Sequence, residues 1–247
     1  EDCYYEMPIS KLTGNIDYSE SLRASKAYAN KVNLTDMMFR KPTKSVAFDE
    51  LSKKECKEIE GIPLFADVRG FTSQFDNDDT NLEEMAIKTQ NILTTMYDQV
   101  TENHGVHVAL FHNYAGYECL LDAVKAGLKM IDAVQTYGVS IGVGESFGKM
   151  FATRIGARGE KDYLLIGTTV IEADRNEDEN AQANQLVISN DVYLMLKKDK
   201  PKWANIFIKQ DGYYYTTTGY DMLMNLISQE QLKVNNRNNN YNGAWRE

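Results

Sequence analysis

The feature that most constrains this chain is the stretch Ile62–Phe75, which reads IPLFADVRGFTSQF. The apolar run Ile62–Ala66 is typical of a buried strand, so Asp67 places a carboxylate at the carboxyl end of that strand. The connection Val68–Thr72 contains Gly70, which lets the backbone approach a ligand closely. A long helical pattern follows, and backbone amides at a helix N-terminus attract phosphate. The stretch therefore predicts a metal-holding carboxylate beside a phosphate-binding turn.

A purely structural role for Asp67 stays open at this point. An aspartate after a strand can cap the next helix, and here it can also pair with Arg69 two residues later. For a single aspartate without a partner motif, these structural roles are the more frequent ones. The wider sequence has to decide between the two hypotheses.

The octapeptide FADVRGFT, residues 65–72, resembles the first signature of the class III nucleotidyl cyclase catalytic domain. The resemblance continues through a helix ending at Asn103–Gly105, a second helix ending near Gln135, and the strand YGVSIGVG followed by Glu145. It includes the run IGARGEKDYLLIGTTVIEADRNED, residues 155–178, and in all it covers roughly Ile62–Leu196. The family fold that this implies is α+β and ferredoxin-like, βαββαβ, with a mainly antiparallel sheet and helices on one face.

Length and composition fit one catalytic domain with extensions. The chain has 247 residues, of which 43% are hydrophobic and 26% charged. We expect an N-terminal arm with short helices over residues 1–60, the cyclase catalytic domain over 61–200, and a C-terminal extension with an asparagine-rich tail over 201–247. Within the arm, the charged residues 51–60 predict a short solvated helix.

Periodicity places the principal elements of the expected domain. Apolar residues at helical spacing predict amphipathic helices over 82–103 and 115–134. A third helix is expected over 168–183. The alternation of apolar residues with glycine and serine between 139 and 144 predicts a strand, in which glycine permits close packing of a neighbour.

The charge and the cysteines limit the classes of partner. A net charge of -9 argues against a nucleic-acid surface and against binding to an anionic membrane. The three cysteines are widely spaced and form no CxxC pattern, so neither a disulfide framework nor a zinc site is expected. With no signal-peptide pattern and no apolar run near the roughly 20 residues of a membrane span, we expect a cytoplasmic protein.

The resemblance implies a metal-dependent cyclisation. The ribose 3′-oxygen attacks the α-phosphate while pyrophosphate leaves, and two divalent cations about 3.5–4 Å apart stabilise the negative charge. In this sequence the family pattern assigns metal binding to the carboxylate of Asp67 and the carbonyl of Val68, with Mn²⁺ or Mg²⁺ as the two cations. It assigns phosphate binding to the amides of Gly70, Phe71 and Thr72.

The second metal-binding aspartate of the family has no counterpart here. Family members carry it on a Gly-Asp hairpin after the His-Gly turn, whereas this sequence runs from Val108 directly to Ala109. Even a tight hairpin needs about two turn residues. Two hypotheses stay open: a loop is omitted from the sequence between Val108 and Ala109, or the gene has lost it and the protein is a degenerate cyclase.

The family motif on a later helix assigns two further residues. Arg175 occupies the position of an arginine that stabilises charge at the α-phosphate, and Thr169 stands where a residue contacts the base. Ile171 replaces the asparagine that orients the ribose. The structural alternative for Arg175 is an ion pair with Glu172 or Glu179 on the same helix.

The VRGFT turn and the missing asparagine are similar to the pyrimidine cyclases of the bacterial Pycsar anti-phage system. This implies conversion of UTP, or else CTP, to a 3′,5′-cyclic nucleotide that acts on a separate effector. It also implies a homodimer with shared active sites, in which one subunit supplies the aspartate and the other the arginine. Two alternatives stay open: an adenylate or guanylate cyclase in cell signalling, and a catalytically dead cyclase fold that binds a nucleotide or a partner protein.

Overall fold

The structure is a computed structural model, and the residues that it describes are 38–40, 51, 55–71, 81–105, 109–112, 119–155 and 162–229. The chain folds as two compact units. The first comprises residues 1–59 and 151–166, and the second comprises residues 60–150 and 167–247.

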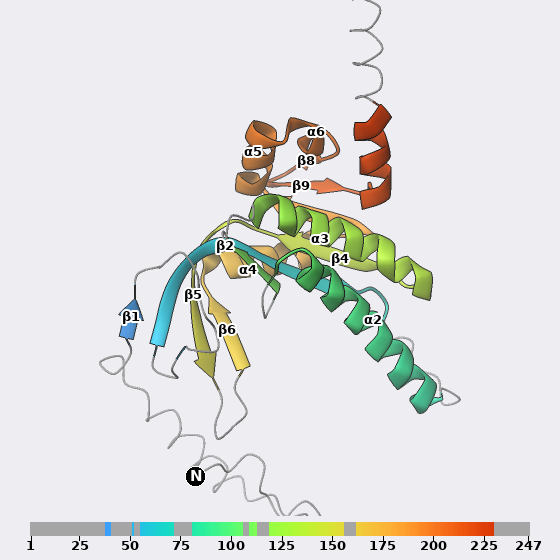
Figure 1. Ribbon diagram of the computed structural model, residues 1–247, viewed down its shortest axis with the longest axis horizontal. Coiled ribbons are helices and arrows are strands. Elements are labelled where there is room, and N and C mark those ends of the chain that lie inside the picture. The colour runs from blue at the N-terminus through green and yellow to red at the C-terminus, as the bar shows by residue number, and fades with distance from the viewer. Residues whose placement is uncertain are drawn as a thin grey trace, which may run out of the picture. The chain divides into compact units, whose positions relative to one another are not determined.

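The described residues of the first unit lie mainly in strands. Strand β1 (Met38–Arg40) pairs in parallel with the start of β2 (Glu55–Val68), and β5 (Gly148–Ile155) pairs antiparallel with β6 (Asp162–Ile166) (Figure 1). The helix expected over 51–60 is wrong, because residues 55–60 are part of β2. Backbone pairing with β1, and a hydrogen bond of 2.9 Å from the Thr153 hydroxyl to the Glu55 carbonyl, override the charged composition.

The second unit contains a mixed, mainly antiparallel sheet. The later part of β2 pairs antiparallel with two strands, β3 (Leu110–His112) and β4 (Ile141–Glu145). Strand β4 pairs in parallel with β7 (Gln185–Ser189), which is followed outward by the antiparallel β9 (Tyr213–Thr216) and β8 (Ile208–Gln210). The expected α+β fold class is confirmed.

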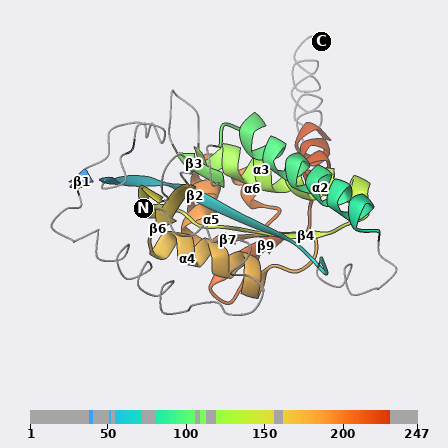
Figure 2. The same cartoon turned by 90° about the horizontal axis from the view of Figure 1, so that it is seen from below.

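Two helices cover one face of this sheet (Figure 2). Helix α2 (Leu82–Glu102) begins at Asn81, whose side chain accepts hydrogen bonds from the next turn, and it buries Ile92, Met96 and Val100. Helix α3 (Cys119–Val134) is largely buried and is followed by a short 3₁₀ turn, η6 (Gln135–Tyr137). Both helices match the expected amphipathic segments as far as the described residues reach.

Helix α4 (Thr168–Arg175) and the π-helical turn η7 (Asn176–Asn180) pack against the other face (Figure 2). Successive residues of a strand point to opposite faces, so Gly142 and Gly144 of β4 face α4 and η7. A Cβ atom at Gly144 would overlap with the Ala173 carbonyl and the Glu177 amide. The expectation of helices on one face holds for α2 and α3, and α4 adds a second layer.

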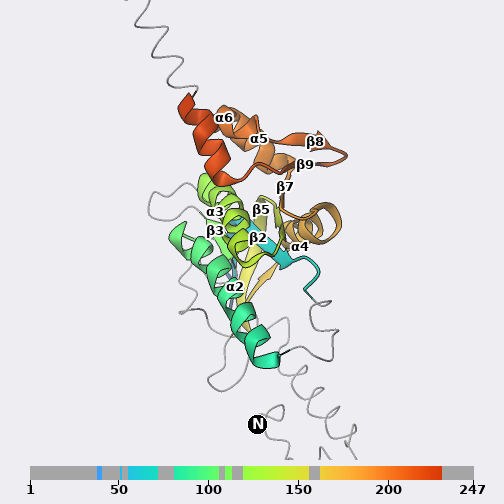
Figure 3. The same ribbon diagram turned by 90° about the vertical axis from the view of Figure 1, so that its right-hand side faces the viewer.

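The C-terminal segment packs onto α3 (Figure 3). It contains α5 (Asn190–Asp199), which Ser189 caps, and α6 (Pro201–Ala204), and residues 220–229 are helical. The Asp132 carboxylate of α3 accepts a hydrogen bond of 3.2 Å from the Asp221 amide, and Leu223 is only 1% exposed. Among the helices of the described residues, none is long and apolar enough to cross a membrane.

Glu145 is a carboxyl group buried in the core. Its side chain lies beneath α3, where a Cβ atom at Gly127 would be 2.9 Å from Oε1, and neither buried carboxyl oxygen has a hydrogen-bond partner among the described residues. Burial raises the pKa of Glu145 to about 8. The group is therefore protonated in the folded chain at neutral pH.

This buried carboxyl group predicts a pH-dependent stability. In the unfolded chain Glu145 ionises near its ordinary pKa of 4.5, whereas in the folded chain it holds its proton up to about pH 8. The folded state binds more protons between these values, so the free energy of unfolding should fall by a few kcal/mol as pH rises from about 4.5 to 8. Glu145→Gln should flatten this slope in urea denaturation.

The exposed Glu102 of α2 provides the matched control. Glu102→Gln removes the same ionisable group from the surface and should leave the slope as it is in the unmodified chain. An equal slope in the Glu145→Gln and Glu102→Gln variants would show that Glu145 is not the group responsible.

Candidate functional site

Asp67 lies at the carboxyl end of β2, as the sequence predicts. It pairs with Gly142 of β4, and its side chain is 66% exposed. The carboxylate is thus held by a regular strand and remains accessible to solvent. This geometry suits a group that binds a cation from solution.

The carbonyl of Val68 points away from β4. The Arg69 amide donates to the Ser140 carbonyl at 2.9 Å, so Arg69 and Ser140 form a hydrogen-bonded pair of the antiparallel ladder. In an antiparallel ladder, such pairs alternate with pairs that exchange no hydrogen bonds. Val68 and Ile141 form a pair of the second kind, so the Val68 carbonyl does not bond to β4. The Val68 side chain is buried, but its carbonyl is not committed to this ladder.

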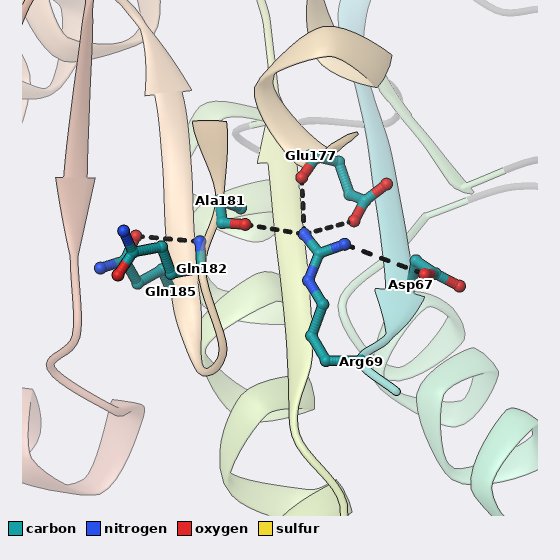
Figure 4. A network of polar contacts seen from close by, with 6 residues as sticks. All are labelled: Asp67, Arg69, Glu177, Ala181, Gln182 and Gln185. Carbon is teal, nitrogen blue, oxygen red and sulfur yellow. Dashed lines mark hydrogen bonds and ion pairs between the residues drawn. The ribbon is translucent and has the colours of Figure 1, made fainter. Parts of the chain in front are cut away.

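The Arg69 side chain crosses β4 and joins the end of β2 to η7 (Figure 4). Its Nη2 lies 2.7 Å from the Glu177 carboxylate and donates to the carbonyls of Glu177 at 2.6 Å and Ala181 at 2.9 Å. Its Nη1 lies 3.8 Å from the Asp67 carboxylate. One guanidinium therefore has a close carboxylate partner on η7 and a looser one on β2.

The absence of a side chain at Gly142 makes this crossing possible. A Cβ atom there would overlap with the Arg69 guanidinium. Gly142 and Gly144 point to the same face of β4, so one admits the arginine and the other admits η7. The two glycines of β4 therefore leave the space that Arg69 and η7 occupy.

Glu177 is a buried carboxylate that pairs with the Arg69 guanidinium. Burial raises its pKa, and the Arg69 guanidinium opposes that rise. Both groups are only partly accessible, with 24% of the Arg69 side chain and 9% of the Glu177 side chain exposed. Removal of Arg69 would leave the buried Glu177 charge uncompensated, and removal of Glu177 would leave Arg69 with the looser contact to Asp67.

The turn after β2 has the conformation that Gly70 requires. Gly70 adopts φ 66°, a left-handed conformation that favours glycine. Phe71 packs partly on the core and lines one side of a groove of about 630 Å³ along α2. Thr72, the third residue assigned to the phosphates, lies outside the described residues.

The two residues expected on α4 occupy different environments. Thr169 is buried, and its hydroxyl donates to the Lys149 carbonyl at 3.2 Å. Arg175 is 58% exposed, and its Nε lies 3.6 Å from the Glu179 carboxylate, the structural alternative that the sequence offered. Within one chain, no contact of the described residues joins Arg175 to Asp67. Their assigned roles stay predictions.

Few metal-binding groups lie near Asp67 among the described residues. The described residues contain no group of three or more His, Cys, Asp or Glu side chains that could hold a metal ion. Asp67 supplies one accessible carboxylate, and the Val68 carbonyl is free of the β4 ladder. These two groups suit a cation that takes its other ligands from substrate phosphates and water, as Mg²⁺ commonly does.

Sequence reasoning missed Glu177. The pairing of Asp67 with Arg69 was one of its alternatives, but the closer partner of Arg69 lies 108 residues away on η7. Two signals were available: the alternating glycines of β4 and an acidic run after Arg175. Neither identifies which carboxylate folds back onto the arginine.

Solved structures of nucleotide cyclases superimpose on this chain. The adenylyl cyclase CyaB from P. aeruginosa superimposes with a TM-score of 0.53 at 18% identity, over 65% of this chain and 94% of that one. The fold is that of the class III cyclases. The guanylyl cyclase Cya2 gives a TM-score of 0.50 at 20% identity, over 64% of this chain and 90% of that one.

A larger share of the chain matches another solved structure. A class III adenylyl cyclase-like ATP-binding protein from Pseudomonas aeruginosa gives a TM-score of 0.63 at 16% identity, over 89% of this chain. This chain spans about half of that protein, 51% of its length. No protein-family model matches the sequence, and no curated protein sequence matches it. At these identities the likeness establishes the cyclase fold alone.

The close approach of Arg69 and Gly142 predicts a strong coupling between them. Gly142→Ala should lower the free energy of unfolding by roughly 1–3 kcal/mol, because the new methyl group displaces the guanidinium. In an Arg69→Ala background the same substitution should cost much less, since the space is then vacant. Urea denaturation of the four chains measures this double-mutant cycle. Additive costs would mean that the two positions do not interact.

Proposed function

We propose that this protein is a metal-dependent nucleotide cyclase that converts a nucleoside triphosphate to its 3′,5′-cyclic product and pyrophosphate. The observation that carries the proposal is the exposed Asp67 carboxylate, held at the end of β2 beside the left-handed turn at Gly70, in a chain with the class III cyclase fold. A strand end, a carboxylate and a glycine turn together suit a cation and a phosphate group.

The chain's own residues divide the work as follows. Asp67 and the Val68 carbonyl would hold a divalent cation, Mn²⁺ or Mg²⁺, which when bound supplies charge stabilisation at the phosphates. The turn amides of Gly70 and Phe71, with Thr72, would orient the phosphate chain. Arg175, exposed on α4, would stabilise charge at the α-phosphate.

The proposed substrate is a pyrimidine nucleotide, UTP in the first place and CTP in the second. The support is the similarity of the VRGFT turn to pyrimidine cyclases, and the apolar Ile171 at a position where the family pattern has asparagine. Ile171 is 58% exposed on α4, so it is available at a surface. The cyclic product would act on a separate effector in anti-phage defence. ATP and GTP are the alternatives, because the compared structures include adenylyl and guanylyl cyclases.

A second candidate function is nucleotide binding without catalysis. Two observations favour it: the described residues supply one carboxylate to the cation site, and one of the compared structures is a cyclase-like ATP-binding protein. The exposed Asp67 and Arg175 favour the catalytic proposal.

The proposed site is shared between two copies of the chain. Among the described residues, Arg175 forms an ion pair with Glu179 and none with Asp67 of the same chain. A head-to-tail homodimer would bring Arg175 of one subunit to Asp67 of the other, which gives two sites per dimer.

A nucleotide panel tests the activity. The protein is incubated with Mn²⁺ and each of ATP, GTP, CTP and UTP, and the products are identified by mass spectrometry. We expect cyclic UMP, or else cyclic CMP, and Asp67→Asn should reduce the rate at least 100-fold, in the range seen when one strongly stabilising group is lost. The matched control Asp191→Asn, at the start of α5, should retain the activity.

Each other outcome of the panel decides between the alternatives. A cyclic purine would replace the pyrimidine assignment. Triphosphate binding without release of pyrophosphate would favour the non-catalytic function. Full activity in the Asp67→Asn variant would contradict the assigned role of this carboxylate.

A mixing experiment tests the shared sites. Asp67→Ala and Arg175→Ala chains should each be inactive alone, and their mixture should regain up to roughly a quarter of the activity, because in half of the dimers one of the two sites is intact. The measurement is the rate of pyrophosphate release by the mixture. The absence of any recovery would count against sites shared between subunits.

A further inference from the structure

Arg69 is a fixed positive charge beside the proposed cation ligand. Three interactions hold its Nη2, namely the Glu177 carboxylate at 2.7 Å, the Glu177 carbonyl at 2.6 Å and the Ala181 carbonyl at 2.9 Å. All three oxygen atoms lie on or directly after η7, which packs on β4 (Figure 4). The guanidinium is therefore anchored on the side away from Asp67.

Asp67 interacts more weakly than Glu177 with the Arg69 guanidinium. The 3.8 Å between Arg69 Nη1 and the Asp67 carboxylate is longer than a hydrogen bond, and Asp67 is 66% exposed. The carboxylate is free to take a cation, but that cation must approach an arginine that cannot move aside. Two positive charges at this distance repel each other even when solvent screens them.

We propose that Glu177 holds Arg69 in place as a resident cation that weakens the binding of a free divalent metal ion at Asp67. Arg69 is thus a positioning residue and Glu177 its anchor. A metal ion that carries the negative charge of a triphosphate is not repelled in this way. The site accordingly discriminates against the bare ion and in favour of the ion bound to nucleotide. This inference rests on the proposed function, because it takes Asp67 as the metal ligand.

Glu177 and Arg69 should have opposite effects on metal binding. Without Arg69 the repulsion disappears, and free Mn²⁺ should bind more tightly. Without the Glu177 carboxylate the guanidinium keeps its two backbone acceptors but loses its closest negative charge. Its positive charge then acts on Asp67 with less compensation, so free Mn²⁺ should bind more weakly. A merely structural role for the pair would move both variants in the same direction.

The experiment measures the binding of Mn²⁺ alone to the full chain by electron paramagnetic resonance, with no nucleotide present. Arg69→Gln should lower the dissociation constant for Mn²⁺ on the order of tenfold, and Glu177→Gln should raise it. Lys197→Gln on α5 removes the same charge at an exposed position and is the matched control, with an expected change of less than about twofold.

A double variant covers the case in which Arg69→Gln alone fails to fold because Glu177 is left unpaired. Arg69→Gln with Glu177→Gln removes both charges together, and it should bind Mn²⁺ as tightly as the single Arg69→Gln variant is expected to. Circular dichroism confirms the fold of each variant. Binding by the folded arginine variants that is no tighter than in the Lys197→Gln control overturns the inference.

The Asp67→Asn variant distinguishes a failure of this inference from a failure of the proposed function. Added to Arg69→Gln, it should abolish the gain in Mn²⁺ affinity. If the gain persists, the ion is bound elsewhere, and both this inference and the role of Asp67 as a metal ligand fail. If cyclisation depends on Asp67 but removal of Arg69 brings no gain, the inference alone fails and the proposed function stands.

Discussion

The arrangement of the candidate site depends on one ion pair, that of Arg69 with Glu177. It links two segments that are 108 residues apart in sequence, and it holds η7 against β4, the strand beside β2. Because both partners are largely withdrawn from water, the pair is costly to break from one side only. The same interaction fixes the direction of the Arg69 guanidinium and thereby the electrostatic surroundings of Asp67.

This ion pair is possible because β4 lacks side chains on one face. Gly142 leaves room for the guanidinium, and Gly144 leaves room for the backbone of η7. On the opposite face of β4, Val143 and Glu145 fill the space beneath α3. A single short strand thus separates an apolar layer, where burial favours the protonated form of a carboxyl group, from a polar layer, where a carboxylate pairs with arginine.

Much of the fold and part of the site could be predicted from the sequence. Apolar periodicity located α2 and α3, and the run that ends at Asp67 located the strand end, because local patterns determine these elements. The helix expected over 51–60 failed because pairing with β1 and the Thr153 hydrogen bond depends on residues distant in sequence. Glu177 was missed for the same reason. The roles of Arg175 and Thr169 involve a substrate and a second subunit, which no pattern within one chain specifies.

Residues after Leu196 are part of the same folded core as the rest of the second unit. The family resemblance ends at Leu196, yet Ala204, Phe207, Tyr214 and Leu223 are all part of the same hydrophobic core as β2 and α3. Strand β9 also supplies the backbone partner of β7. A fragment cut at the end of the resemblance would expose that apolar surface and an unpaired strand edge, both of which promote aggregation. The hydrophobic core and the sheet thus extend beyond the part of the chain whose sequence motifs resemble those of a cyclase.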